Sequence, residues 1–154
     1  MADMVYAIKD TLKVIESKIA ASGQVKQTQV GEPKSPPSNL PAAAIYMDSV
    51  RIYRMTVDGG TREVHTVTVR VYADMLKEPQ EWNEYGLAEV AENLINKLLT
   101  DADLNSKVMT IDAAGMAGQG VEMRWGYLDV SGKMHRIVDI GLPLIVNDSI
   151  TIAP

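Results

Sequence analysis

Residues 51–72 read RIYRMTVDGGTREVHTVTVRVY and predict a long β-hairpin. Apolar and polar side chains alternate on both sides of an Asp-Gly-Gly turn at 58–60, whose residues tolerate positive φ angles. In the returning strand, Val67, Val69 and Val71 are expected on one face, with Thr and Arg side chains on the other. The hairpin therefore predicts a sheet with one covered face and one more polar face.

Two amphipathic helices are predicted in the sequence before and after this hairpin. Apolar residues at spacings of three and four give residues 3–22 and 84–99 one apolar stripe each. Pro143 is expected to place the end of the last strand at an edge or an exit of the sheet. Further strands are predicted at residues 42–47, 107–111, 121–130 and 133–146. The predicted fold class is α+β in the order α-β-β-β-α-β-β-β, two helices on a mainly antiparallel sheet of about five to six strands.

The 154 residues are expected to form a single domain with two irregular segments. Residues 24–40 are polar and contain three prolines and one glycine, which break helix and strand patterns. They are either a solvated surface loop or an arm that becomes ordered only against a neighbouring subunit. Residues 147–154 are expected to be an irregular C-terminal tail.

The composition excludes several classes of function. Cysteine is absent, which excludes disulfides, thiolate metal sites and cysteine nucleophiles. A net charge of −5 argues against a dedicated nucleic-acid binder, because duplex affinity depends largely on neutralising phosphates. The N-terminal sequence lacks the basic region of a signal peptide, and no run approaches the roughly 20 apolar residues of a membrane span. We therefore expect a protein made in a reducing cytoplasm, with no membrane partner.

Candidates for acid–base chemistry are few. A histidine base could come only from His65 or His135, and each lies in an alternating strand. A histidine at such a position is more often a packed or surface polar residue than a catalyst. Without other candidates, we predict no enzyme activity and no catalytic residues.

Metal and nucleotide sites also lack their usual patterns. Asp101, Asp103 and Asp112 do not have the spacing of a calcium loop and are expected to be solvated. The glycine-rich residues 115–120 lead into a strand, whereas a phosphate-binding loop leads into a helix whose N-terminus holds the anion. We therefore predict no metal and no cofactor.

Residues 40–46 read LPAAAIY and lie between the irregular segment and the hairpin. They resemble the start of the first main strand in the tail terminator (tail completion) proteins of long-tailed bacteriophages, the lambda-type family. In that family an aliphatic or aromatic residue, a proline, small apolar residues and an aliphatic–Tyr pair open the strand after a long loop. Residues 63–73 resemble the family's returning strand, which ends at an aromatic–small pair, and residues 121–146 resemble its closing strands. The likeness covers most of the chain in topology and about thirty residues in pattern.

The resemblance implies a structural virion protein that forms a homo-hexameric ring, ends polymerisation of the tail tube and joins it to the head neck. Its partners would be copies of itself, the major tail tube protein and a head-completion or neck protein, with DNA only in transit. It would be made in the bacterial cytoplasm and lie at the tail–neck junction of the virion. Residues 24–40 and 133–154 are longer than compact family members need, so a head–tail connector, a stopper or a minor tail protein stays open. A small α+β hydrolase or ligand-binding domain is the alternative from a different class.

A closed ring needs contacts in which two different patches of one fold meet. Strand edges and long loops supply such patches, because edges pair readily across subunits. The residues predicted to contribute lie in the arm, the first hairpin and the glycine-rich loop: Lys34, Pro36, Pro37, Arg51, Tyr53, Arg54, Met116 and Gln119.

Overall fold

A computed structural model describes residues 4–54, 60–75, 80–105, 107–108 and 110–147. Its helices are α1 (Met4–Ala21), the short 3₁₀ helix η1 (Gln80–Asn83) and α2 (Tyr85–Leu99). Its strands are β1 (Gln27–Val30), β2 (Ala42–Arg54), β3 (Thr61–Asp74), β4 (Thr110–Ile111), β5 (Glu122–Val130) and β6 (Lys133–Asn147). The α+β class and the predicted order of helices and strands are both confirmed. The predicted turn residues 58–59 and tail residues 148–154 lie outside the described residues.

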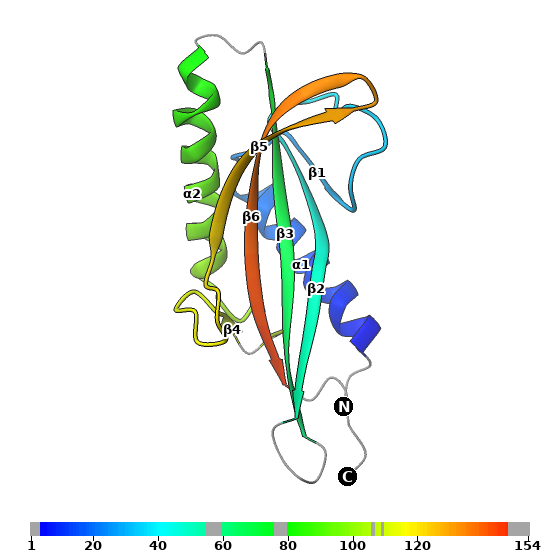
Figure 1. Cartoon of the computed structure of the whole chain (residues 1–154), viewed down its shortest axis with the longest axis vertical. Coiled ribbons are helices and arrows are strands. Elements are labelled where there is room, and N and C mark those ends of the chain that lie inside the picture. Colours follow the sequence, from blue (N-terminus) through cyan, green and yellow to red (C-terminus); the bar gives the residue numbers. More distant parts are fainter. Residues whose placement is uncertain (1–3, 55–59, 76–79, 106, 109, 148–154) are drawn as a thin grey trace.

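The strands form one curled sheet in the order β1-β2-β3-β6-β4, and β5 also pairs with β6 (Figure 1). Every pairing is antiparallel except that of β1 with β2, so the sheet is mixed. The lower ends of β2, β3 and β6 extend past both helices in Figure 1. This leaves a long three-stranded ribbon at one end of the molecule.

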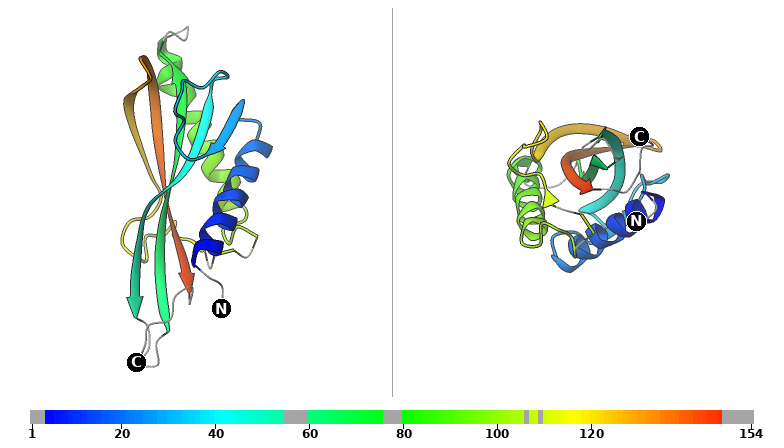
Figure 2. Two further views of the ribbon diagram at one scale, coloured as in Figure 1. Left: turned by 90° about the vertical axis from the view of Figure 1, so that its right-hand side faces the viewer. Right: turned by 90° about the horizontal axis from the view of Figure 1, so that it is seen from below.

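Both helices lie outside the curl of the sheet, as the right-hand view of Figure 2 shows. Their apolar stripes and one face of the sheet form the main core, in which a buried Leu or Ile contributes about 1.5–3 kcal/mol. Members of this core from the two helices and from β3 include Leu12, Ile15, Ile19, Leu87, Leu94, Leu98, Val67, Val69 and Val71. The predicted alternation of β3 is therefore confirmed.

The predicted strands at 42–47 and 51–57 are parts of the single strand β2. The pairing with β3 shifts register between Met47 and Ser49, where a bulge places one extra residue on β2. Asp48 and Ser49 interrupt the apolar pattern there, and the sequence pattern alone resembled a break between two strands. Three strands were predicted before α2, and the structure has three, because β1 adds one strand where two predicted strands merge into β2.

The prediction that residues 24–40 are irregular was wrong for Gln27–Val30, which form β1. This strand pairs in parallel with the first four residues of β2, and hydrogen bonds flank the ladder: Lys26 N–H to Pro41 O and Gly31 N–H to Ile45 O, both 2.8 Å. Its side chains are mostly polar and half-buried, so the sequence has no apolar alternation that would predict a strand. The strand is defined by its pairing with β2.

Pro143 lies inside β6, so the predicted end of the strand there was wrong. The N–H and C=O of one strand residue point to the same side, and the Pro143 carbonyl accepts the Asp112 N–H at 2.8 Å. The missing N–H of Pro143 therefore faces the gap between β5, which pairs up to Gly141, and β4, which pairs from Leu144. A proline at this position removes no hydrogen bond to β3.

The rest of the arm covers part of the opposite sheet face. There Ala44, Tyr72, Val130 and Ile137 form a second, smaller apolar cluster, against which Leu40 and Leu128 pack. The Ser131 hydroxyl also donates to the Lys34 carbonyl at 2.8 Å. Neither interpretation of residues 24–40 describes this arrangement, because the arm is packed against its own chain.

Candidate interaction surfaces

Both histidines lie inside the fold. His65 is 3% exposed and His135 is completely buried, where its ring meets Tyr72 edge-on with centroids 5.8 Å apart. Burial lowers the pKa of His65, and the nearby Glu63 carboxylate opposes that shift. Neither ring nitrogen of His135 has a hydrogen-bond partner within the described part of the chain. These positions agree with packed polar residues.

The polar face of the sheet is centred on Arg70 of β3. Its guanidinium binds the Asp139 carboxylate of β6 through two hydrogen bonds, Nε to Oδ1 at 2.7 Å and Nη2 to Oδ2 at 3.0 Å. Glu32 of the arm lies 3.7 Å from the same guanidinium, which sits 5.5 Å from the centre of the Tyr46 ring. The hydrogen bond to Asp139 raises the pKa of Arg70, and burial raises that of Tyr46 to about 12. Arg70 is thus already paired with carboxylates and is poorly placed to bind phosphate.

A groove of about 370 Å³ runs along this face. It is lined by both signs of charge, including Arg70, Glu122, Arg124 and Asp139. Ligand pockets are mostly apolar with a few converging polar groups, so this groove has the character of an exposed sheet surface.

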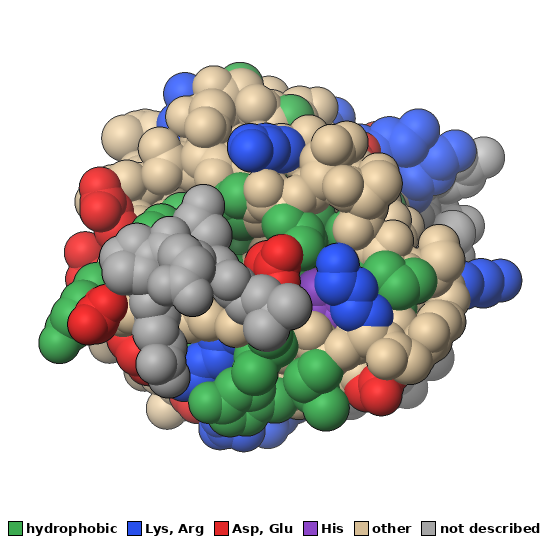
Figure 3. Space-filling model, turned by 90° about the horizontal axis from the view of Figure 1, so that it is seen from above, with side chains coloured by type: hydrophobic (Ala, Val, Ile, Leu, Met, Phe, Trp, Pro, Cys, Tyr) green, Lys and Arg blue, Asp and Glu red, His purple; other side chains and the backbone are tan. Residues whose placement is uncertain are grey.

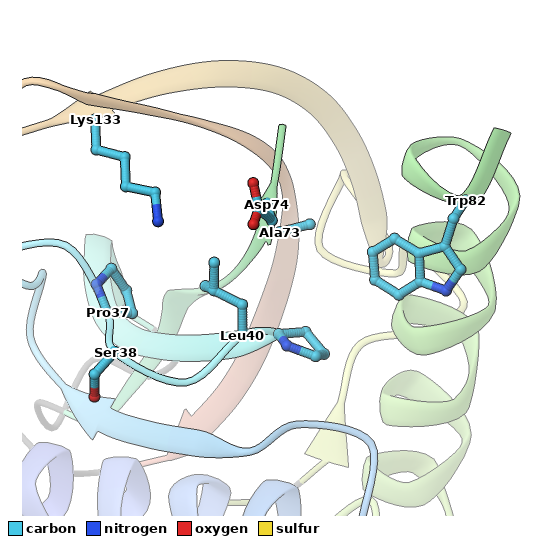
Figure 4. A pocket seen from close by; sticks show the side chains of 8 residues that line it. Pro37, Ser38, Leu40, Ala73, Asp74, Trp82 and Lys133 are labelled. Atoms are coloured by element: carbon cyan, nitrogen blue, oxygen red, sulfur yellow. The ribbon is translucent and has the colours of Figure 1, made fainter. Parts of the chain in front are cut away.

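A second hollow, of about 290 Å³, lies at the end of the molecule viewed in Figure 3, where apolar side chains gather beside acidic and basic ones. In Figure 4, Lys133 points into it, Asp74 lies at the end of β3 and Trp82 stands at the far side. The Ser38 hydroxyl, which also lines it, donates to the Gln27 side chain at 3.3 Å. The hollow therefore brings together one carboxylate and one ammonium group, without a base beside the serine among the described side chains.

Two further features of the described ranges bear on function. No group of three or more His, Asp or Glu side chains there could hold a metal ion. No described helix combines the length and apolar character needed to cross a membrane.

Asp112 anchors the glycine-rich loop, and the expectation that it is solvated was wrong. The residue is 2% exposed, and its carboxylate accepts the N–H groups of Met116 at 2.8 Å and Ala117 at 2.7 Å. Gly115 turns the chain with φ of 72°, which brings those N–H groups back to the carboxylate. An aspartate directly before a short glycine-rich loop was the signal for this role, because Asp side chains often bond backbone N–H groups in turns.

The two longest stretches of strand with a neighbour on one side only, in the described structure, belong to β2 and β5. β1 pairs only with the first four of the 13 residues of β2, so residues 46–54 have no strand on their outer side. The nine residues of β5 pair only with β6. Large exposed apolar side chains lie on these two strands, at the end of β1 and at the start of β6: Ile52, Tyr53, Tyr127, Val30 and Met134.

The residues predicted to contribute to a subunit contact fall into three places. Arg51 and Gln119, from different segments, line the same small hollow of about 50 Å³ beside the β2 edge, and both are exposed. Tyr53 lies on the same edge, and Met116 is 84% exposed at the loop tip. The side chain of Arg54 lies outside the described residues.

The arm residues differ from one another. Lys34 is exposed and Pro36 half-buried, whereas Pro37 is buried within its own chain and offers little surface to a neighbour. Sequence reasoning missed Tyr127 and Met134, which sit across the β5–β6 hairpin from the arm. Their signal was apolar residues on both faces of the hairpin end.

No family model matches the chain, and no curated protein matches it.

Proposed function

We propose that the chain is a ring-forming tail terminator of a long-tailed bacteriophage, which caps the tail tube, joins it to the head neck and leaves a channel for DNA. The observation that carries the proposal is the two longest uncovered stretches of strand, residues 46–54 of β2 and the strand β5, which differ in sequence and lie on opposite sides of the central strands β3 and β6. Two different patches on one fold give head-to-tail contacts, and such contacts close into rings when the rotation between copies allows it.

The arrangement around residues 40–46 supports the same proposal. The LPAAAIY stretch ends a long arm and opens β2, and the returning strand β3 ends at Tyr72-Ala73-Asp74 before the connection to α2. This is the order of segments that the resemblance to tail terminators implies. The paired state of Arg70 also suits a channel that lets DNA pass without retaining it, because its guanidinium is already bound to carboxylates.

The test is removal of the gene from a phage that carries it. We expect tails of uncontrolled length that fail to join heads, and restoration of normal particles when the intact gene is supplied in trans. Normal virions after the deletion would contradict the proposal. Tails of normal length that lack heads would instead favour the connector or stopper role.

A further inference from the structure

The two uncovered edges match each other in length. Residues 46–54 of β2 and the strand β5 each span nine residues. We propose that the β2 edge of one copy pairs antiparallel with the β5 edge of a second copy, so that one sheet continues from subunit to subunit. This inference rests on the proposed ring and names the surfaces that close it.

Both edges are only partly protected against pairing. Monomeric proteins place lysine or proline on exposed edges, or keep those edges short. Residues 46–54 and 122–130 contain neither lysine nor proline, and the bulge of β2 lies near one end of its free stretch. Large apolar side chains are exposed on both, with Ile52 at 42% and Tyr127 at 60%. Edges of this kind are expected to be covered in the working state of the protein.

The strand directions allow the pairing. β2, β3, β6 and β5 are antiparallel neighbours in turn, so β2 and β5 run in opposite directions within one chain. Rotation about an axis along the strands leaves those directions unchanged. The β2 of one copy therefore meets the β5 of the next in antiparallel orientation, as a continuous sheet requires.

The faces of the two edges also match. Val50 and Ile52 pair with His65 and Glu63, which share the helix-side face of β3 with Val67. On β5 the helix-side positions include Trp125 and Tyr127, which pair with Val138 and Arg136 of β6. When the edges join, Val50 and Ile52 of one copy lie on the same face of the continued sheet as Trp125 and Tyr127 of the next.

On the polar face, Arg51 of one copy comes to the same side as Glu122 of the next. The formal charges of the edges are opposite: Asp48, Arg51 and Arg54 give +1 on residues 46–54, and Glu122, Arg124 and Asp129 give −1 on β5. Opposite charges favour pairing of unlike edges and disfavour the pairing of two identical ones.

The backbone of β5 shows which groups would bond. Ser131 and Gly132, with φ of 49° and 91°, form the two-residue turn between Val130 and Lys133. The pair beside such a turn is hydrogen-bonded within the hairpin, and alternation then directs the N–H and C=O groups of Trp125 and Tyr127 outward. These groups are free to bond the next copy.

Cysteine cross-linking tests the pairing. Because the chain has no cysteine of its own, only the introduced cysteines can form disulfides. Ile52→Cys is combined in turn with Met123→Cys, Trp125→Cys and Tyr127→Cys, so that no register is assumed. After mild oxidation, at least one double variant should give a ladder of covalent oligomers on a non-reducing gel, because paired strands bring Cα atoms within disulfide range. Each single variant should run as one chain.

The outcomes separate the pairing from the ring. Rings seen by native mass spectrometry, with no cross-link in any double variant, would overturn the pairing and leave the proposed function standing. Cross-linking by Ile52→Cys alone would overturn it too, because like edges would then meet. A chain that stays monomeric would contradict the proposed function as well.

A matched pair of substitutions at one position tests the backbone bonds. Tyr127→Pro removes an outward N–H without removing a bond of the β5–β6 ladder, whereas Tyr127→Ala removes only the side chain. We expect proline to weaken association by about tenfold more than alanine, with both variants folded by circular dichroism. Equal association of the two variants would contradict edge pairing.

Discussion

Arg70 on β3 and Asp139 on β6 are direct cross-strand partners, and their side chains meet through two hydrogen bonds of 2.7 and 3.0 Å on the polar face of the sheet. The side chains are 15% and 27% exposed, which limits screening by water. Glu32 approaches the same guanidinium from the arm. The pair therefore ties the two central strands to each other and to the segment that precedes β2.

Replacing Asp139 with alanine is expected to lower the free energy of unfolding by about 1–3 kcal/mol, because it leaves a mostly buried guanidinium with a single distant carboxylate. Urea unfolding measures the change. The matched control is Glu122→Ala, which breaks the exposed pair with Arg124 and should cost less than about 0.5 kcal/mol. Equal losses in the two variants would show that the Arg70–Asp139 pair stabilises the fold no more than the exposed Arg124–Glu122 pair does.

Gly86 lies beneath the indole of Trp82, and a Cβ there would overlap the ring. Gly86→Ala should therefore displace Trp82 and destabilise the fold by about 1–3 kcal/mol, despite the better helix propensity of alanine. In a Trp125→Phe background, the Trp82 fluorescence should shift to longer wavelength. The double variant Trp82→Ala with Gly86→Ala should be at least as stable as Trp82→Ala alone, since the overlap is then gone. A further loss of stability in that double variant would contradict the contact.

Removing the Asp112 carboxylate should free the glycine-rich loop. Asp112→Ala is expected to cost about 1–3 kcal/mol, because the part-buried N–H groups of Met116 and Ala117 lose their acceptor. Hydrogen exchange at those two amides should become much faster, while exchange in β3 changes only with global stability. Asp112→Asn keeps one acceptor oxygen, so its stability and its exchange rates at these amides should lie between those of the unchanged chain and those of Asp112→Ala. Unchanged exchange at both amides would contradict the anchoring role.

Acidification should destabilise the fold through His65. Its pKa in the folded chain lies below the unfolded value of about 6.5, so the unfolded state binds the proton first. The free energy of unfolding should therefore be highest above pH 6.5 and fall as the pH drops below it towards the folded pKa. His65→Leu should flatten this dependence in urea titrations between pH 8 and 5. An equally steep dependence in His65→Leu would assign the effect to other groups.

The helices and the long hairpin could be predicted because their patterns are local. The stripe of α1 and the alternation of β3 repeat over several turns or residues, and each pattern has one physical reading. The single strand β2 could not be told from two, because a bulge at Asp48 and a turn give the same local interruption. The polar strand β1 and the embedded Pro143 depend on which strands lie beside them, and a sequence pattern does not contain that information.

The candidate surfaces were predictable in part for the same reason. Arg51 and Tyr53 were predicted because they lie in a recognisable hairpin, and the structure leaves that edge open. Pro37 is buried because the arm folds back beside Tyr72, a long-range arrangement without a local signal. Tyr127 was missed because the sequence does not show that β5 pairs only with β6.

The mass of the purified protein in solution tests the central claim most directly. Native mass spectrometry, with negative-stain images of the same sample, should show six copies of the 16.8 kDa chain, about 101 kDa, as rings with a central opening. A chain that remains at 16.8 kDa across the accessible concentration range would contradict the account.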